Sequence, residues 1–417
     1  MREKQITFSP RHHQLTNSNV WTADSQWLAF DVRPSGASFT SETIERVNVQ
    51  TGAVEVLYRA TDGAHVGVVT VSPDLPPRYL CIHGPEQPDE RWHYDFHHRR
   101  GAIVQNGRAQ NLDACDITPP FTPGALRGGS HVHLFSPDGT RVSFTYNDHV
   151  MHEKDLKEDL RNVGIALPLR AVDPIKQHPR EYGGSHFCVL ISRTTATPRP
   201  GSDEINRACE EGWIGTRGYQ KPDGSWQRWA IAFIGDTLSA AGDKQPEVFI
   251  VDLPEALEAY AMPGDEPLEG TESSLPAPPA GVHQRRLTNT PRGLAQQPRH
   301  WLRSAPDGSA IAFLMADEQD VVQLWTVSPN GGEPRQVTRL AHSVQSAFSW
   351  HPQGVAVAFI SDNQVMRCDI SSGACQPLTD RSEEPPSGDA VVWSPDGQLI
   401  AFMREVDGWR QLFTVSA

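Results

Sequence analysis

A pair of histidines in the segment Gly128-Gly-Ser-His-Val-His is the clearest chemical feature of this 417-residue sequence. His131 and His133 are two residues apart, so on a β-strand their side chains would point to the same side. Imidazoles combined with a carboxylate suit divalent transition metals such as Zn, Mn, Fe or Ni. The pair therefore predicts part of a metal site, to which residues from elsewhere in the chain must contribute.

Three arginines stand near other histidines of interest in the sequence, namely Arg127, Arg180 and Arg299. A guanidinium group can bind a carboxylate through two parallel hydrogen bonds. Beside a metal, such arginines would hold a carboxylate-bearing substrate, and the ordinary alternative is an arginine in a surface loop. We expect these three residues to contact substrate, and the sequence identifies no general base to go with them.

The elements that must position these residues come from an internal repeat of an apolar strand, a Ser/Ala-Pro-Asp-Gly-like turn and a second apolar strand. Proline presets φ, aspartate bonds the backbone and glycine accepts positive φ, so the motif predicts a tight turn. A third strand often follows, and a fourth ends in Leu-Thr or Val-Thr. Four strands per unit predict an all-β propeller of about seven four-stranded blades. The copies lie near Val20, Val71, Leu134, Pro306, Pro352 and Pro395, with a degenerate one between His186 and Ile234.

The two chain ends predict how the ring closes. The last unit stops after its third strand, Gln411-Leu-Phe-Thr-Val, and the missing fourth-strand signature appears at the N-terminus as Lys4-Gln-Ile-Thr. We expect this segment to complete the C-terminal blade, because closure leaves no open sheet edge. Residues 1–417 would then form a single propeller domain, with surface insertions near 151–180, 195–228 and 254–283.

Aligning the repeats on their turns extends the metal hypothesis. Innermost strands surround the channel of a propeller, so their side chains at one level should form a ring. We expect a metal site of His131, His133, His186, His300 and Asp389, with His65 one step along the channel wall. The competing interpretation is that these histidines hydrogen-bond the backbone near turns. The positions that match His131 in the other repeats are Asn17, Gly67, His186, His300, Ser346 and Asp389.

Two other histidine motifs are interpreted as surface features. The segment His152-Glu-Lys-Asp-Leu begins like a zinc-protease helix but lacks the second histidine, so it predicts a charged helix over 151–162. The cluster His97-His98-Arg99-Arg100 is expected to be a solvated basic stretch of an outer strand or loop. Neither a P-loop nor a Gly-x-Ser-x-Gly motif is present, so NTPase and serine-hydrolase functions lack support.

Composition restricts the partners. A net charge of −14 argues against nucleic acid, and it would repel an anionic substrate unless a local positive centre overrides it. No run of 18 apolar residues and no apolar signal-peptide core occur, so we expect a cytoplasmic protein with no membrane partner. The six cysteines are then expected to be reduced, including Cys368 and Cys375, which flank one short turn.

The repeats, with their Ser-Pro-Asp-Gly turns and Leu-Thr endings, resemble the TolB-like propellers. Over nearly its full length the chain resembles the bacterial YidR family, through Arg33-Pro-Ser-Gly-Ala-Ser-Phe, His93-Tyr-Asp-Phe-His-His-Arg-Arg and Gly128-Gly-Ser-His-Val-His. A weaker resemblance, through Ala64-His-Val-Gly and Ser130-His-Val-His, is to oligogalacturonate lyases. Those are seven-bladed propellers with a divalent metal held mainly by histidines, although this chain lacks the glutamine that precedes their metal-binding strand.

Two functions from different classes follow. The lyase resemblance implies a metal-dependent enzyme that removes the proton next to the carboxylate of a uronate, giving β-elimination on an acidic oligosaccharide. The TolB-like resemblance implies a non-catalytic propeller that binds a protein or peptide on one face. Elemental analysis of the purified protein separates the two, because only the first requires a stoichiometric divalent transition metal.

Overall fold

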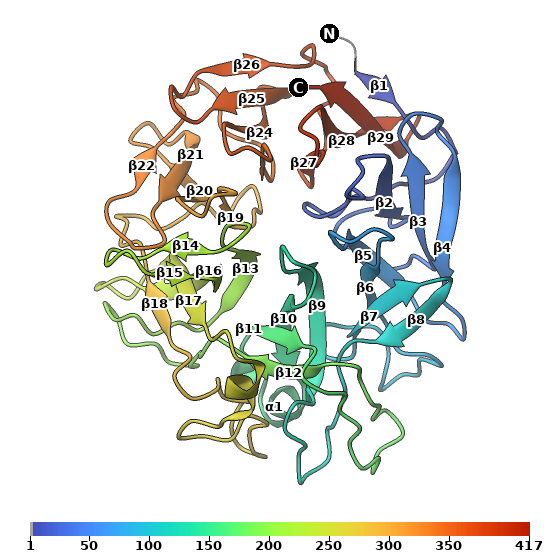
Figure 1. The fold of residues 1–417 in the computed structure, drawn as a ribbon, viewed down its shortest axis with the longest axis vertical. Coiled ribbons are helices and arrows are strands. Elements are labelled where there is room, and N and C mark those ends of the chain that lie inside the picture. Colours follow the sequence, from blue (N-terminus) through green and yellow to red (C-terminus); the bar gives the residue numbers. More distant parts are fainter. Residues whose placement is uncertain (1–2) are drawn as a thin grey trace.

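The structure is a computed structural model, and it describes residues 3–417. Sheets stand radially around a central channel, each with one strand toward the channel and one at the outer edge (Figure 1). Seven such sheets follow one another along the chain, and an eighth, two-stranded sheet is a separate hairpin. The prediction of a seven-bladed, all-β propeller is therefore confirmed.

The first four blades surround the part of the channel that concerns function. Blade 1 contains β2 (Trp27–Asp31), β3 (Thr43–Asn48) and β4 (Val54–Arg59), and its inner segment joins through bridges at Gln14 and Trp21. Blade 2 contains β5 (Val66–Val71), β6 (Tyr79–His83), β7 (Arg100–Gln105) and β8 (Arg108–Asn111). Blade 3 contains β9 (Gly128–Phe135), β10 (Val142–Asp148), β11 (Asn162–Leu167) and β12 (Phe187–Leu190). Blade 4 contains β13 (Ala208–Trp213), β16 (Trp229–Leu238), β17 (Lys244–Leu253) and β18 (Gln284–Arg286).

The last three blades complete the ring. Blade 5 contains β19 (Arg303–Ser304), β20 (Ile311–Ala316), β21 (Val322–Val327) and β22 (Arg335–Gln336). Blade 6 contains β23 (Ser349–Trp350), β24 (Ala356–Ser361), β25 (Gln364–Asp369) and β26 (Cys375–Pro377). Blade 7 contains β27 (Val391–Trp393), β28 (Leu399–Val406), β29 (Trp409–Ser416) and β1 (Lys4–Gln5). Outside the blades lie α1 (His149–Lys154), the 3₁₀ helices η1 (Leu156–Glu158) and η2 (Leu257–Ala261), and the hairpin of β14 (Tyr219–Gln220) and β15 (Trp226–Gln227).

The ring closes as the chain ends predict. Lys4 pairs with Thr414 and Gln5 with Phe413, so β1 is the outer strand of blade 7 (Figure 1). The amide of the buried Ile6 also donates to the carbonyl of Leu412, at 2.9 Å. The first and last segments of the chain therefore share one sheet.

The repeated turn has the chemistry that its sequence predicts. In blade 3, Asp138 accepts hydrogen bonds from the hydroxyl of Ser136 at 2.7 Å and from the amide of Thr140 at 3.1 Å. Gly139 follows with φ of +71°, a region that residues with a side chain rarely adopt. These contacts fix the hairpin between the two inner strands of the blade.

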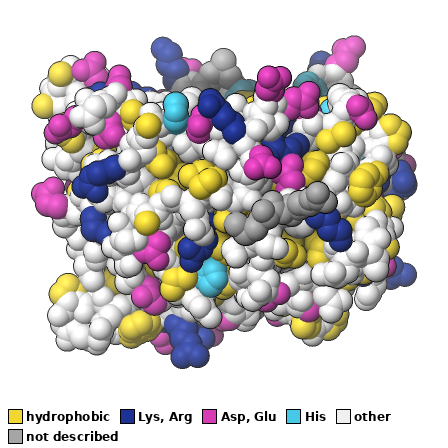
Figure 2. Space-filling view, turned by 90° about the horizontal axis from the view of Figure 1, so that it is seen from above, with side chains coloured by type: hydrophobic (Ala, Val, Ile, Leu, Met, Phe, Trp, Pro, Cys, Tyr) yellow, Lys and Arg dark blue, Asp and Glu magenta, His cyan; other side chains and the backbone are white. Residues whose placement is uncertain are grey.

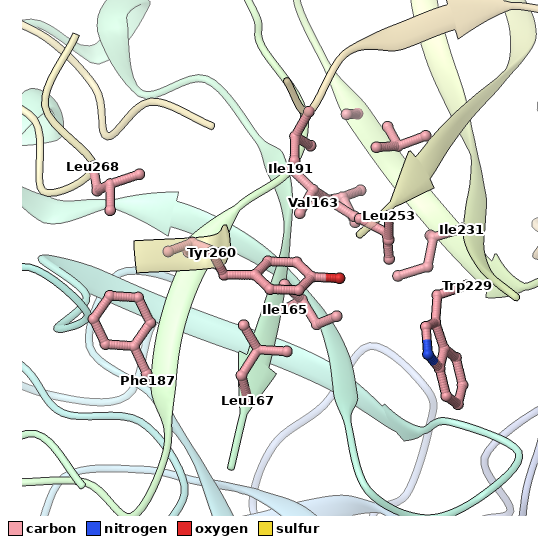
Figure 3. Close-up of a cluster of buried hydrophobic side chains, with 14 of the residues drawn as sticks. Val163, Ile165, Leu167, Phe187, Ile191, Trp229, Ile231, Leu253, Tyr260 and Leu268 are labelled. Carbon is pink, nitrogen blue, oxygen red and sulfur yellow. The ribbon is translucent and has the colours of Figure 1, made fainter. Parts of the chain in front are cut away.

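Apolar side chains fill the space between neighbouring blades. Between blades 3 and 4, Ile165, Phe187 and Ile231 belong to one cluster of buried side chains (Figure 3). Tyr260 and Leu268 extend this cluster from the segment between β17 and β18, which belongs to the predicted insertion 254–283. Burial of such side chains is the main source of stability in a fold of this kind.

The two other predicted insertions have different limits in the structure. Strand β11 lies inside the range 151–180, and α1 with η1 occupies only the loop that precedes it. The range 195–228 contains β13, the innermost strand of blade 4. The degenerate repeat from His186 to Ile234 therefore joins the end of blade 3 to the start of blade 4, because β12 is an outer strand.

The surface and the thiols show two further properties. On the edge of the disc seen in Figure 2, acidic side chains are interspersed with Lys and Arg. Among the residues described, no helix has both the length and the apolar character needed to cross a membrane. All six cysteines are free thiols, and Cys368 and Cys375 face each other across β25 and β26.

Candidate functional site

Two equivalent loops, one from blade 2 and one from blade 3, meet and bring four histidines together. His97 and His98 lie in the loop from β6 to β7, and His149 and His152 lie on α1, which follows β10. The Asp148 carboxylate caps α1 by accepting from the amide of Met151 at 2.8 Å. Because residues three apart share a helix face, both α1 histidines point to the same loop.

The histidines form two pairs. The ring centroids of His97 and His152 are 3.6 Å apart, and those of His98 and His149 are 4.9 Å apart. Asp95 joins the pairs, since its two oxygens lie 3.3 Å from Nδ1 of His97 and 3.3 Å from Nδ1 of His98. This carboxylate therefore orients two imidazoles at once, the role that such partners have beside metal-binding histidines.

The first pair forms a three-residue cluster with Asp159. One potential ligand atom each from His97, His152 and Asp159 lies within 4.8 Å of the other two. Nε2 of His97 is 2.5 Å from Oδ2 of Asp159, and Nδ1 of His152 is 3.5 Å from the same oxygen. Two imidazoles and one carboxylate with open positions are a donor set for Fe, Mn or Zn.

A buried nitrogen without a hydrogen-bond partner indicates that the cluster fits a metal ion. Nδ1 of His152 is buried and has no hydrogen-bond partner among residues 3–417. A buried polar atom without a partner is costly, and a metal ion would satisfy it. Burial opposes a charge on His97, but hydrogen bonds to Asp159 and Asp95 outweigh it and raise the pKa of His97 to about 9. Without metal the cluster is thus held as an ion pair, and the residues fit a divalent cation that replaces the proton.

Positive charge lies directly beside the cluster. The amide of Asn147 donates to Oδ1 of Asp159 at 3.0 Å, and Nε of Arg161 donates to the Asn147 oxygen at 3.2 Å. Arg161, Arg207 and Lys244 line a pocket of about 400 Å³ together with Asp159 and with Asp236, which pairs with Lys244 at 2.8 Å. Burial and the nearby charge of Arg207 lower the pKa of Arg161 to about 10, so the guanidinium stays charged at neutral pH.

Comparison with known proteins assigns the family. The chain is 61% identical over 410 residues to the protein "Uncharacterized protein YidR" of Escherichia coli (strain K12), which covers 97% of this chain and 96% of that protein. The chain belongs to the YidR family. A family model described as "Protein of unknown function (DUF3748)" matches residues 65–182, the part of this YidR-family chain that contains all four clustered histidines.

Solved structures resemble the YidR-family propeller in fold. An oligogalacturonate lyase in complex with manganese matches with a TM-score of 0.58 and 12% identity, covering 99% of this chain and 92% of that one. The β-propeller domain of the trilobed protease from Pyrococcus furiosus matches with a TM-score of 0.52 and 10% identity, covering 97% and 95%. At these identities the likeness concerns the arrangement of blades.

His131 lies on the innermost strand β9 of the YidR-family propeller, as the register predicts. Burial holds the pKa of His131 well below its ordinary value, and the charges of Arg99, Arg161 and Arg299 lower it further. The guanidinium of Arg299 is half-exposed and bonds Glu210 at 2.7 Å.

His133 does not share the orientation of His131, so the prediction of a histidine pair facing one side is wrong. Val132 between them has φ of +54°, and the pairing of β9 with β10 shifts register there. Nε2 of His133 instead contacts the hydroxyl of Ser130 at 2.9 Å. A methyl group on Gly101 of blade 2 would come within 2.6 Å of that nitrogen, so His133 faces the neighbouring blade.

Two other predicted ligands are also elsewhere. His186 directly precedes β12, an outer strand, and its Nδ1 contacts the hydroxyl of Ser185 at 2.9 Å. His300 is at the predicted level, but both ring nitrogens bond the backbone. Nδ1 lies 3.1 Å from the carbonyl of Pro298, and Nε2 accepts from the amide of Leu314 at 3.2 Å. The backbone-bonding interpretation is therefore right for His300.

His65 and Asp389 lie outside the three-residue cluster. His65 directly precedes β5, and its carbonyl accepts from the amide of Gly84 at 2.8 Å. Asp389 is exposed on the opposite side of the ring, in the loop before β27. Its carboxylate contacts Gln14 at 3.3 Å and Arg410 at 3.5 Å.

Two predicted substrate-binding arginines already have protein partners. Arg127 is fully buried, forms an ion pair with Asp148 at 2.7 Å, and donates to the carbonyls of Thr271 and Ser274. It therefore anchors the segment between β17 and β18 and is inaccessible to substrate. Arg180 donates to two loop carbonyls and contacts Asp89 at 2.8 Å.

The clustered residues are those that the sequence analysis interpreted as solvated. His97 is 3% exposed and Asp159 is 6% exposed, so neither belongs to a solvated surface stretch. The repeat did contain a signal for this cluster. His97-His98 and His149/His152 both lie between the second and third strands of successive blades. Equivalent loops of neighbouring blades open on the same face of the propeller, which makes them candidates for one site.

Proposed function

We propose that the protein is an enzyme that uses a divalent transition metal held by His97, His152 and Asp159 to act on an acidic carbohydrate by β-elimination at a uronate. The observation that carries this proposal is the hydrogen-bonded connection from Asp159 through Asn147 to Arg161. It puts a set of metal-ligating side chains next to a guanidinium that lines an open pocket. The similarity in fold to an oligogalacturonate lyase in complex with manganese supports the same proposal.

The residues around the pocket account for recognition of an acidic substrate. Mn, Fe, Zn or Ni suits the donor set, and such an ion when bound would acidify the proton on the carbon next to a carboxylate. Arg161 and Arg207 can each bind a carboxylate oxygen pair. Asp236 pairs with Lys244 at 2.8 Å, so the guanidinium groups of Arg161 and Arg207 supply the local positive charge that a protein of net charge −14 needs to attract an anion.

We propose that His149 takes the proton, because one of its ring nitrogens is left with a free lone pair. Nδ1 of His98 lies 3.2 Å from the carbonyl oxygen of His93, which only accepts, so this nitrogen carries a hydrogen. Nε2 of His98 must then accept from Nδ1 of His149, 3.1 Å away, which leaves the lone pair on Nε2 of His149. Burial lowers the pKa of His149 to about 4, so the ring is neutral at pH 7 and its free lone pair is available, as a weak base.

Metal content and product formation test the proposal together. We expect about one transition metal ion per chain by elemental analysis, and a rise in ultraviolet absorption when oligogalacturonate is converted to an unsaturated product. The double variant His97→Ala/His152→Ala should lose both properties. His342→Ala removes a histidine with 60% side-chain exposure and should keep both.

The two parts of the proposal can fail separately. Stoichiometric metal without any unsaturated product would refute the reaction and leave the metal site standing. Protein that takes up no metal, even after incubation with excess Mn²⁺ or Zn²⁺, would refute both. In that case the non-catalytic alternative, a propeller that binds a protein or peptide on one face, becomes the better account.

A further inference from the structure

A second pocket, of about 350 Å³, lies at one end of the central channel, between the innermost segments of blades 1, 2, 5, 6 and 7. Its walls include Ala23, Pro73, Pro352 and Pro395, which belong to turns between the first and second strands of their blades. The clustered histidines lie in loops between second and third strands. Because successive strands are antiparallel, these two kinds of connection are on opposite faces of the propeller. This channel-mouth pocket is therefore separate from the proposed metal site.

Arg303 extends from blade 5 across the channel beside this pocket. Its Nη2 donates to Oδ1 of Asn17, in the inner segment of blade 1. Blades 6 and 7 lie between these two blades in the ring, and β19 and β2 are on opposite sides of the channel (Figure 1). Nη1 donates to the carbonyls of Leu302 at 3.0 Å and Glu211 at 3.4 Å. Neutral acceptors from three blades therefore hold the guanidinium in place.

No carboxylate forms an ion pair with this guanidinium within the described chain. The hydrogen bonds of Arg303 among residues 3–417 all use Nη1 and Nη2, so its Nε remains free. Burial raises the pKa of Glu211 to about 8, and that side chain is mostly neutral at pH 7. Burial lowers the pKa of Arg303 to about 10, so the guanidinium stays charged. Arg303 is the one charged residue among the described residues that line the channel-mouth pocket, which is therefore positive.

An indole N–H at the pocket is also without an acceptor. Trp21, Trp350 and Trp393 occupy the same position of the repeat in blades 1, 6 and 7, and all three line the pocket. Nε1 of Trp21 donates to the carbonyl of Val392 at 3.1 Å, and that of Trp350 donates to the carbonyl of Arg303 at 2.9 Å. Each of these indoles thus reaches the preceding blade. Trp393 is 6% exposed, and its Nε1 has no partner among residues 3–417. An unpaired buried donor is costly, and a bound acceptor would satisfy it.

We propose that the channel-mouth pocket binds a small organic carboxylate with an aromatic body. A guanidinium with a free N–H and an indole N–H are donors for the carboxylate. The three tryptophans, with Val20 and Val71, supply an apolar surface for the ring. A single charged residue favours a monoanion, and about 350 Å³ lies at the lower end of the range for small-molecule sites.

Binding of phenylacetate to the full-length protein tests this proposal, with phenylacetamide as its neutral counterpart. Isothermal titration should show about one phenylacetate per chain, bound on the order of tenfold or more tightly than the amide, because only the acid forms a charge-assisted hydrogen bond. Arg303→Met should remove this preference. Trp393→Phe, which keeps an aromatic ring and loses the N–H, should weaken binding of the acid several-fold. Arg292→Gln changes an exposed arginine paired with Asp320 and should bind like the wild type.

The channel-mouth pocket shares no residue with the metal centre or with the pocket of Arg161, so the two proposals can fail separately. The His97→Ala/His152→Ala protein should therefore bind phenylacetate with unchanged affinity. Loss of binding in that variant would place the carboxylate at the metal site and overturn the proposal. So would equal affinity for acid and amide, no binding of phenylacetate at millimolar concentration, or a folded Arg303→Met protein that keeps the preference.

Photolabelling of the wild-type protein locates the site without depending on how the variants fold. A benzoate that carries a photoreactive diazirine should label residues 18–23, 349–352 or 392–395, as mapped by mass spectrometry. Excess phenylacetate should prevent this labelling, and excess phenylacetamide should have little effect. Labelling confined to other segments, or equal protection by the acid and the amide, would contradict binding at the channel mouth.

Discussion

Nε2 of His97 lies 2.5 Å from Oδ2 of Asp159, although 62 residues separate them in the sequence and they belong to loops of different blades. The contact joins blade 2 to blade 3 on one face of the propeller. With His152 it forms the cluster to which we assign the metal, and through Asn147 it leads to the arginines of the neighbouring pocket.

Metal binding should stabilise the fold measurably. A ligand that binds only the native state at one hundred times its dissociation constant raises the free energy of unfolding by about 2.7 kcal/mol. We expect Mn²⁺ or Zn²⁺ to raise the melting temperature of chelator-treated protein, as measured by scanning calorimetry. His152→Ala should abolish the increase, and His342→Ala should preserve it. An equal increase in the His152→Ala protein would show that the metal binds elsewhere.

The buried Glu211 should make stability depend on pH. Burial raises the pKa of Glu211 to about 8 from its ordinary 4.5, so the native state keeps a proton that the unfolded state releases. The free energy of unfolding therefore falls as the pH rises between these values. The Glu211→Gln protein has no such titration. The difference in stability between this variant and the wild type should therefore grow in favour of the variant as the pH rises from about 5 to about 8. The slope is at most about 1.4 kcal/mol per pH unit.

Urea unfolding of both proteins at the two pH values measures this difference. Glu333→Gln, which changes an exposed glutamate, provides the control and should show no such trend. A Glu211→Gln protein whose relative stability is the same at both pH values would mean that Glu211 is ionised in the native state.

We expect Arg127 to contribute to the stability of the fold and not to catalysis. Removing one partner of a buried ion pair costs about 3–5 kcal/mol, because the remaining charge, here that of Asp148, is left uncompensated. Arg127→Met should therefore lower the urea midpoint strongly and make the segment 254–283 more sensitive to protease. Metal uptake per folded molecule should be unchanged. A variant with wild-type stability and lost activity would restore Arg127 as a substrate-binding residue.

Closure of the ring by the N-terminal strand should contribute to global stability. Ile6 is 2% exposed and packs in the core between blades 7 and 1. Ile6→Ala should cost about 2–5 kcal/mol, the usual range for an isoleucine buried in a core. Ile175→Ala, at a side chain that is 83% exposed, should change stability by less than about 0.5 kcal/mol. Equal effects of the two substitutions on the urea midpoint would show that closure is not cooperative with the rest of the fold.

The sequence alone determined the architecture, because a propeller is made of local units. Each Pro-Asp-Gly turn and its two flanking strands are specified by adjacent residues, as the contacts of Asp138 and Gly139 illustrate. The complementary ends required only that Lys4-Gln-Ile-Thr be recognised as a displaced fourth strand. The blade count and the closure of the ring could therefore be predicted from the sequence.

The tertiary structure alone decided which side chains share a site. The bulge at Val132 turns His133 away from His131, and backbone amides and carbonyls engage both nitrogens of His300. Conversely, His97 and His152 looked solvated because their burial depends on a neighbouring blade. Local spacing fixes the direction of a side chain only while the strand is regular, and contacts between loops of different blades depend on how the blades pack. The prediction that histidines form a ring at one level of the channel was therefore wrong. The cluster between the two loops could be identified only from the tertiary structure.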